Sequence, residues 1–222
     1  NDLLETDHSP GYGSAARFIA LATLGVGMDA ESMGKTSPIT VLELMGRNSG
    51  WMVAASALGK RADRDPPHVV CPPEIIFDED RFTTQVEEAY RRWGYAVAVV
   101  SENLHHDVGP VGHEGNPVHI DAFGHAYYQS PGQYLVERLA SQLQVRVRYE
   151  KPGTIQRSLV ACTSAVDASE AHMVGRQAVR VALTGLTDVM VTLVRDPSAM
   201  YACSTGITRL DRVASTERHL PP

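Results

Sequence analysis

The chain of 222 residues has few cysteines and no long apolar segment. Cys71, Cys162 and Cys203 stand far apart, so the spacing indicates neither a zinc site nor a framework of disulfides. Free thiols suit a reducing compartment, and we expect a cytoplasmic protein. No apolar run approaches the roughly 20 residues that span a bilayer, and the first residues lack the pattern of an export signal. We therefore predict no membrane partner.

Lysine is also scarce, since Lys35, Lys60 and Lys151 are the only three lysines among 20 basic residues. The 26 acidic residues outnumber the basic ones and give a formal net charge of -6. Binding to a nucleic-acid backbone needs a positively charged face, so we expect no nucleic-acid partner. The many arginines reflect either GC-rich coding or planar guanidinium groups that grip phosphates, and both interpretations stay open at this point.

What the chain does contain is an alternation of short apolar segments with longer helical ones. Strands separated by helices of this length are typical of βαβ units, and they predict an α/β fold with a mainly parallel sheet. The segment 103–126, rich in glycine, histidine and proline, is predicted to be a loop. The predicted strands are 39–46, 68–74, 95–102, 145–153 and 188–196, and the predicted helices are 14–33, 49–62, 78–94, 131–143 and 169–185.

Residues suited to binding a phosphorylated sugar follow the predicted strands. Ligands of parallel sheets bind at the carboxyl ends of the strands. Arginine suits a phosphate, and a carboxylate accepts hydrogen bonds from hydroxyl groups. These residues predict a site for a small phosphorylated molecule with hydroxyl groups, although solvated arginines would give the same pattern. The residues concerned are Met45, Gly46, Arg47, Glu102 and the segment 152–157.

Four motifs in order resemble the phosphofructokinase family: TDHSPGYGSAA (6–16), VLELMGRNSGW (41–51), VVSE (99–102) and PGTIQRS (152–158). The first motif and DAFGH (121–125) are most similar to the pyrophosphate-dependent members. The resemblance implies a three-layer α/β sandwich built on a parallel sheet. It also implies transfer of a phosphoryl group to the 1-hydroxyl of fructose 6-phosphate, which gives fructose 1,6-bisphosphate in glycolysis. Pyrophosphate is the favoured donor, and ATP is the less favoured one.

The resemblance assigns roles to particular residues. Arg47 would lie near the transferred phosphate and would shape the sugar pocket together with its two preceding residues. Glu102 would accept hydrogen bonds from sugar hydroxyls. Arg148 would reach the site of a neighbouring subunit, which implies a homodimer or homotetramer. The groups expected around the 6-phosphate are Arg148, Thr154 and Arg157, and the groups expected around the sugar are Met45, Gly46, Arg47 and Glu102.

The beginning of the chain resembles the end of the family's catalytic loop, T-I-D-N-D. Asn1 and Asp2 match its last two residues, so the general-base aspartate is expected just before Asn1. Asp2 would support that base and lie near the Mg²⁺ cofactor. We therefore expect a fragment that lacks the N-terminal donor-binding part and is inactive on its own. The expected divisions are 1–12 (end of the donor lobe and catalytic loop), 13–156 (fructose 6-phosphate lobe), 157–196 (return to the donor lobe) and 197–222 (a truncated C-terminal segment).

Three positions depart from the family pattern and keep alternatives open. Pro38 stands where the family usually has a basic residue, and proline has no N–H to donate. Thr154 and Asn48 stand where histidine or tyrosine is common. One alternative is a non-catalytic homologue that binds a sugar phosphate as a regulatory or structural subunit. A kinase for another sugar phosphate, such as sedoheptulose 7-phosphate, is a further alternative.

A group of histidines in the glycine-rich segment raises the possibility of a metal site. His105, His106 and His113 lie close in sequence to Asp107. Because the resembled family needs no metal bound by histidine, we favour a flexible loop at this place.

Overall fold

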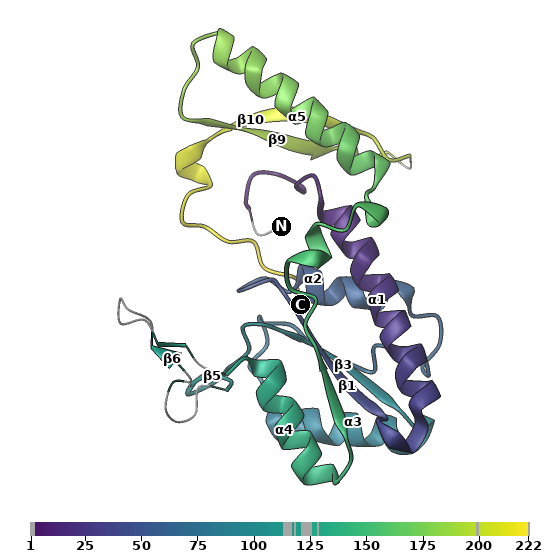
Figure 1. Ribbon diagram of the computed structural model, residues 1–222. Coiled ribbons are helices and arrows are strands. Elements are labelled where there is room, and N and C mark those ends of the chain that lie inside the picture. The colour runs from purple at the N-terminus through teal and green to yellow at the C-terminus, as the bar shows by residue number, and fades with distance from the viewer. Residues whose placement is uncertain are drawn as a thin grey trace. The chain divides into compact units, whose positions relative to one another are not determined.

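The computed structural model describes residues 3–112, 117, 119–120, 126–127, 129–198 and 200–221. The chain divides into two compact units (Figure 1). We call Ile19–Thr154 the sheet unit, and Asn1–Phe18 together with Ile155–Pro222 the hairpin unit. The roles predicted for 1–12, 13–156, 157–196 and 197–222 stay predictions, because this division says nothing about which unit binds a donor.

The sheet unit is built on four parallel strands in the order β2-β3-β1-β8. Every residue of the two central strands, β1 and β3, is buried. Continuous apolar runs of this kind are typical of parallel sheets covered on both faces. The predicted α/β fold with a parallel sheet is confirmed. The strands are β1 (Ile39–Leu44), β2 (Val69–Cys71), β3 (Ala96–Ser101) and β8 (Val147–Glu150).

Helices cover both faces of this sheet (Figure 1). Alternate residues of the strands share one apolar core with Phe82 and Val86 of α3 and with Leu135 and Leu139 of α4. Such alternation follows from the period of two along a strand. The helix α1 begins in the hairpin unit and continues into the sheet unit. The helices are α1 (Tyr12–Met33), α2 (Trp51–Ala55), α3 (Glu79–Trp93) and α4 (Pro131–Leu143).

The bounds of α3 show how local sequence signals set a helix. The carboxylate of Asp78 accepts a hydrogen bond of 2.9 Å from the backbone N–H of Arg81 and so caps the first turn. Glu79 begins the helix with an acidic group, as the helix dipole favours. Gly94 ends it with φ 81°, a left-handed conformation that glycine adopts without strain. The observed helix agrees with the prediction of 78–94 to one residue at each end.

The prediction of one helix over 49–62 is wrong in extent. The α-helix α2 is followed by a 3-10 turn, η2 (Ser56–Gly59), and the helical segment ends there. Beyond this point the ammonium group of Lys60 donates to the backbone carbonyls of Asp65 and Pro67, each at 2.8 Å. The chain therefore folds back on itself after Gly59, which also has a low helix propensity.

The predicted loop 103–126 contributes to two short antiparallel strand pairs among the described residues, the second of which extends to Tyr127. Strand β4 (His105–His106) pairs with β5 (Gly109–Pro110), and β6 (His119–Ile120) pairs with β7 (Ala126–Tyr127). The prediction of a plain loop is therefore wrong for these residues. Strands of two residues leave too little alternation in the sequence to be predicted.

The hairpin unit packs helix α5 (Ala165–Leu183) against an antiparallel pair of strands, β9 (Val189–Arg195) and β10 (Cys203–Arg209). The predictions of 169–185 and 188–196 found α5 and β9, but β10 was missed. Gly206 and its polar neighbours conceal this strand in the sequence. A side chain at Gly206 would approach the Thr192 hydroxyl oxygen at 2.7 Å, so the close pairing of the strands needs glycine here.

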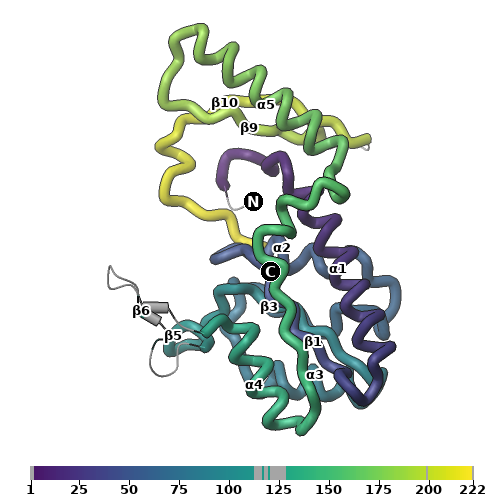
Figure 2. Tube along the Cα trace, viewed as in Figure 1, coloured from purple at the N-terminus to yellow at the C-terminus, as the bar shows by residue number. Residues whose placement is uncertain are grey.

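Four further short 3-10 helices complete the secondary structure of the described residues. Figure 2 traces the N-terminal segment, which is part of the hairpin unit. The backbone N–H of Asp7 donates a hydrogen bond of 2.9 Å to the Leu193 carbonyl. The helices in the described part of the chain are all too short or too polar to span a bilayer. The other 3-10 helices are η1 (Gly34–Thr36), η3 (Gly153–Arg157), η4 (Val160–Cys162) and η5 (Leu210–Arg212).

Within the hairpin unit, Ser14 and Asp167 lock the start of α1 to the start of α5. The Asp167 carboxylate accepts hydrogen bonds from the backbone N–H of Ser14 at 2.6 Å and from its hydroxyl at 2.5 Å. The same hydroxyl oxygen accepts a bond of 2.9 Å from the backbone N–H of Ser164. Burial alone would raise the pKa of Asp167, but the hydrogen bonds that its carboxylate accepts from Ser14 and from the backbone of Gly11 and Gly13 hold the pKa below its ordinary value.

We predict that Asp167→Asn lowers the free energy of unfolding by about 1–2 kcal/mol at neutral pH, because a capping carboxylate is lost. A carboxylate with a depressed pKa contributes its full stability above its ordinary pKa, and this contribution disappears as the pH falls. The difference between the variant and the original protein should therefore shrink below about pH 4. Urea unfolding across this pH range measures it. Asp211→Asn, in an exposed ion pair with Arg209, is the control and should change nothing measurable; an equal loss there would contradict the prediction.

Candidate sugar-phosphate site

The ends of β1 and β3 bring three of the predicted site residues together in the sheet unit. The two strands pair in parallel, with Leu44 opposite Ser101, so the residues that follow them are neighbours. The Glu102 carboxylate accepts hydrogen bonds from the backbone N–H groups of Gly46 at 3.2 Å and Arg47 at 3.4 Å. The prediction that these residues converge at one strand edge is confirmed by this geometry, whereas their roles stay predictions.

The turn after β1 holds an uncommon backbone conformation. Gly46 has φ 155° and Arg47 has φ 42°, and a positive φ is rare for a residue other than glycine. A Cβ atom at Gly46 would lie 2.6 Å from the Ser49 carbonyl oxygen, so only glycine fits. Backbone strain of this kind occurs mostly at functional sites, where the surrounding contacts maintain it. The turn leaves the Arg47 side chain exposed to solvent.

Glu43, two residues before Met45, ties this edge of the sheet together. Its side chain is buried, with 1% of the residue exposed. The carboxylate accepts bonds from the backbone N–H of Gly132 at 2.8 Å and from the Tyr149 hydroxyl at 3.1 Å, and the Lys151 ammonium lies 2.6 Å away. Burial alone would lower the pKa of Lys151, but its bond to Glu43 raises it overall. The network joins β1, α4 and the residues around the end of β8 beside the predicted site.

The other predicted residues each have surroundings of their own. Arg148 lies on β8 and forms an ion pair with Asp29 of α1, so it is not a simply solvated arginine. Met45 is half-buried, and Thr154 is exposed at the end of the sheet unit. Arg157 is exposed and belongs to the hairpin unit.

Several predictions fall outside the described residues or find no support among them. Asp2 and the motif 121–125 lie outside the described residues, as does His113. His106 is engaged with the Phe77 backbone carbonyl at 3.1 Å, and no metal-binding group at His105 and His106 is found in the described part of the chain. Pro38 is buried, and its carbonyl accepts a hydrogen bond of 2.9 Å from the Ala96 N–H. Its side chain has no polar group that could bind a phosphate.

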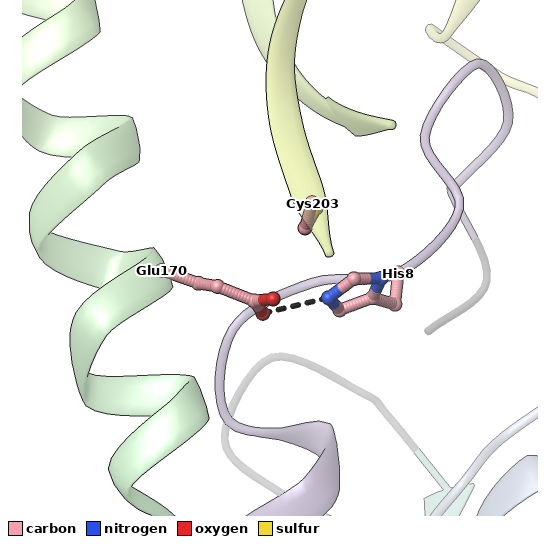
Figure 3. Close-up of side chains that lie close together, drawn as sticks. All are labelled: His8, Glu170 and Cys203. Carbon is pink, nitrogen blue, oxygen red and sulfur yellow. Dashed lines mark hydrogen bonds and ion pairs between the residues drawn. The ribbon is translucent and has the colours of Figure 1, made fainter. Parts of the chain in front are cut away.

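Sequence reasoning missed a second polar site, which lies within the hairpin unit. A cleft of about 720 Å³ is lined there by residues that include His8, Glu170 and Tyr201. His8 Nε2 lies 2.7 Å from a carboxylate oxygen of Glu170, and the Tyr201 hydroxyl bonds to both (Figure 3 draws the first two). Burial raises the pKa of Tyr201, and its bond to Glu170 adds to this, so the phenol stays a donor. The motif around His8 was noted, but its partners lie more than 160 residues away and no local spacing connects them.

Residues 1–182 match the family model described as Phosphofructokinase. The chain belongs to the phosphofructokinase family. It is 38% identical over 228 residues to a pyrophosphate–fructose 6-phosphate 1-phosphotransferase of Rhodospirillum rubrum, and covers 55% of that protein. It is 37% identical to one of Halomonas elongata, of which it covers 52%. Both alignments cover 100% of this chain.

A solved phosphofructokinase has the same fold. The chain superposes on the pyrophosphate-dependent phosphofructokinase of Marinobacter aquaeolei with a TM-score of 0.82 and 34% identity, covering 100% of this chain and 52% of that one. This phosphofructokinase chain therefore spans about half the length of the relatives that it matches. The predicted phosphofructokinase-like fold is confirmed.

We predict that Lys151→Met lowers the free energy of unfolding by about 1–3 kcal/mol, since it leaves the buried Glu43 carboxylate without a cation. The loss stays below that of a fully buried pair because the Lys151 side chain is 43% exposed to solvent. Adding Glu43→Gln to this variant should recover part of the loss, because no buried charge is then left. Denaturant unfolding of the two single variants and the double variant measures the coupling. Losses that simply add would show that the two groups do not depend on each other.

Proposed function

We propose that this chain provides the fructose 6-phosphate site of a phosphofructokinase that uses pyrophosphate as its phosphoryl donor. The single observation that carries the proposal is the strand-end turn, in which Glu102 holds the backbone of Gly46 and Arg47. The names of the relatives from Rhodospirillum rubrum and Halomonas elongata support the choice of substrate and donor. The reaction would be the glycolytic conversion of fructose 6-phosphate to fructose 1,6-bisphosphate.

We infer a task for each group in this reaction from the strand-end geometry and from the family resemblance. Only one Glu102 oxygen, Oε1, accepts the two backbone bonds, so its other oxygen can accept from sugar hydroxyl groups. Arg47 would place its guanidinium against the phosphoryl group in transfer, where fixed positive charge lowers the barrier. By the family resemblance, Met45 would contact the sugar and Thr154 would bind the 6-phosphate. Arg157 belongs to the hairpin unit, and its expected role at the 6-phosphate stays a prediction.

Arg148 has the task of completing the site of a neighbouring subunit in this proposal. The arginine has a carboxylate partner, Asp29, within its own sheet unit. To bind the 6-phosphate it would exchange that partner for the phosphate, which offers a guanidinium the same paired acceptors. The protein would then act as a homodimer or homotetramer.

The cofactor of this proposal is Mg²⁺, which neutralises charge on phosphate oxygens when it is bound. Magnesium prefers oxygen ligands, and the carboxylate of Asp2 is a group of that kind. The one group of potential metal ligands among the described residues, His8, Glu170 and Cys203, includes an imidazole and a thiol. That set does not fit magnesium, so the proposed Mg²⁺ position rests on Asp2.

A second candidate function is binding of a sugar phosphate without catalysis. It is favoured by Pro38, which is buried at the start of β1 and cannot supply the phosphate contact that a basic residue would. Lys35 in η1 is exposed and three residues away, so it is the nearest replacement. The two candidates share the site at Glu102 and differ only in whether transfer follows binding.

We predict that fructose 6-phosphate binds the chain and that Glu102→Gln weakens its binding at least about tenfold. The amide oxygen of glutamine can still accept from Gly46 and Arg47, so the turn is kept while the charge is lost. Isothermal titration calorimetry measures the affinity. Glu87→Gln, a half-buried carboxylate of α3 that pairs with Arg91, is the matched control and should leave the affinity unchanged. Equal affinities of the Glu102 variant and the original protein would refute the proposed site.

Phosphoryl transfer is tested in the protein extended to the length of its relatives, with pyrophosphate or ATP supplied with Mg²⁺. We expect turnover with pyrophosphate and a loss of kcat of at least about a hundredfold in Arg47→Ala, because the charge acts in the transition state. Binding without turnover would support the non-catalytic alternative, and turnover with ATP alone would overturn the choice of donor.

A further inference from the structure

Three potential metal ligands converge in the hairpin unit. The imidazole of His8, the carboxylate of Glu170 and the thiol of Cys203 each present one atom, and these atoms all lie within 4.8 Å of one another (Figure 3). They come from the N-terminal segment, from α5 and from the first residue of β10. The described part of the chain contains no second group of three such residues.

The chemistry of this group suits zinc. A nitrogen, a sulfur and a carboxylate oxygen are the three ligand types that zinc takes in proteins, and three protein ligands leave a fourth position open. Ligand atoms around a tetrahedral zinc ion lie roughly 3.3–3.8 Å apart, as bonds of about 2.0–2.3 Å require. His8 and Glu170 are now 2.7 Å apart in a hydrogen bond. Binding of a zinc ion would increase the distance between these two atoms by no more than about 1 Å. The ion would take the place of the proton that they share.

The surroundings also favour a cation. Glu170 is 4% exposed, and burying a carboxylate costs free energy unless an opposite charge or donors accompany it. The cleft beside it is lined by the carboxylates of Asp7, Asp167 and Asp196 against the guanidinium groups of Arg195 and Arg218. With Glu170, four negative groups face two positive ones. The cleft of about 720 Å³ also provides an entry path and room for a water molecule on the open position.

Tyr201 supplies a further feature of built metal sites. Its hydroxyl donates to one Glu170 oxygen, while His8 Nε2 lies against the other. An outer hydrogen bond of this kind orients a ligand, and its loss commonly weakens metal binding about 10–100-fold. The carboxylate is therefore already held with one oxygen toward the potential metal position.

We propose that His8, Glu170 and Cys203 bind one zinc ion, with the fourth position open to the cleft. The ion would tie the N-terminal segment to α5 and β10. It uses none of the residues proposed for Mg²⁺, and it does not depend on the proposed function. The competing interpretation is a hydrogen-bonded pair of His8 and Glu170 that only fixes the N-terminal segment, with Cys203 nearby but not involved.

Cobalt titration distinguishes these two interpretations. Co²⁺ replaces zinc in such sites, and a thiolate ligand gives it a strong near-ultraviolet charge-transfer absorption that a carboxylate or imidazole does not give. We expect the metal-free protein to bind one Co²⁺ with this absorption, and Zn²⁺ to displace it. Cys203→Ser should abolish the absorption. Cys162→Ser, a buried cysteine of the same unit outside the group, is the matched control and should keep it.

Further variants test the other ligands. His8→Gln and Glu170→Gln should each weaken Zn²⁺ binding at least about tenfold, whereas Tyr201→Phe should weaken it while the thiolate absorption is kept. Circular dichroism checks that each variant is folded, and the stoichiometry of the unchanged protein gives a result that no folding defect affects. Failure of the unchanged protein to bind Co²⁺ or Zn²⁺ would overturn the proposal. Binding that survives in both Cys203→Ser and His8→Gln would overturn it as well, because the ion would then lie elsewhere.

Discussion

The parallel pairing of β1 with β3 is the constraint on which the proposed site depends. Leu44 lies opposite Ser101, so the chain leaves both strands at the same edge of the sheet. Only this register lets Glu102 reach the backbone of Gly46 and Arg47. A slip by one residue would turn every side chain of the strand to the other face. The buried apolar residues of both strands fix the register, and the polar site follows from it.

The turn at this edge of the sheet has an unfavourable backbone conformation, which neighbouring contacts stabilise. The positive φ values at Gly46 and Arg47 are unfavourable by themselves, and the turn persists because its neighbours hold it. Glu43 contributes here, since its buried carboxylate joins β1 to Gly132, Tyr149 and Lys151. Removing one member of such a buried polar network destabilises the fold more than replacing all its members by apolar groups, because a polar group is left without a partner. The polar groups near the site are therefore as much a part of its architecture as the apolar core.

The sequence was most informative where a signal is local. The caps of α3 at Asp78 and Gly94 and the apolar runs of β1 and β3 predicted those elements closely. The convergence of Gly46, Arg47 and Glu102 was also predictable, because it needs only the rule that ligands bind at the ends of parallel strands.

What could not be predicted depends on contacts between distant segments. The strand β10 is polar and contains Gly206, and only its pairing with β9 shows it to be a strand. His8, Glu170 and Cys203 form no motif, since their neighbourhood arises from the packing of three separate segments. The Asp29 partner of Arg148 was hidden for the same reason, because 119 residues separate the two. Spacing rules detect sites made by one segment and miss sites made by several.

The central claim is that the turn after β1 and the residue after β3 form one sugar-phosphate site. Nuclear magnetic resonance of the backbone amides during addition of fructose 6-phosphate tests it most directly. The account predicts that the largest shift changes fall on Gly46, Arg47 and Glu102, with saturation at one ligand per chain. Changes confined to other parts of the chain, or none at saturating sugar phosphate, would contradict it.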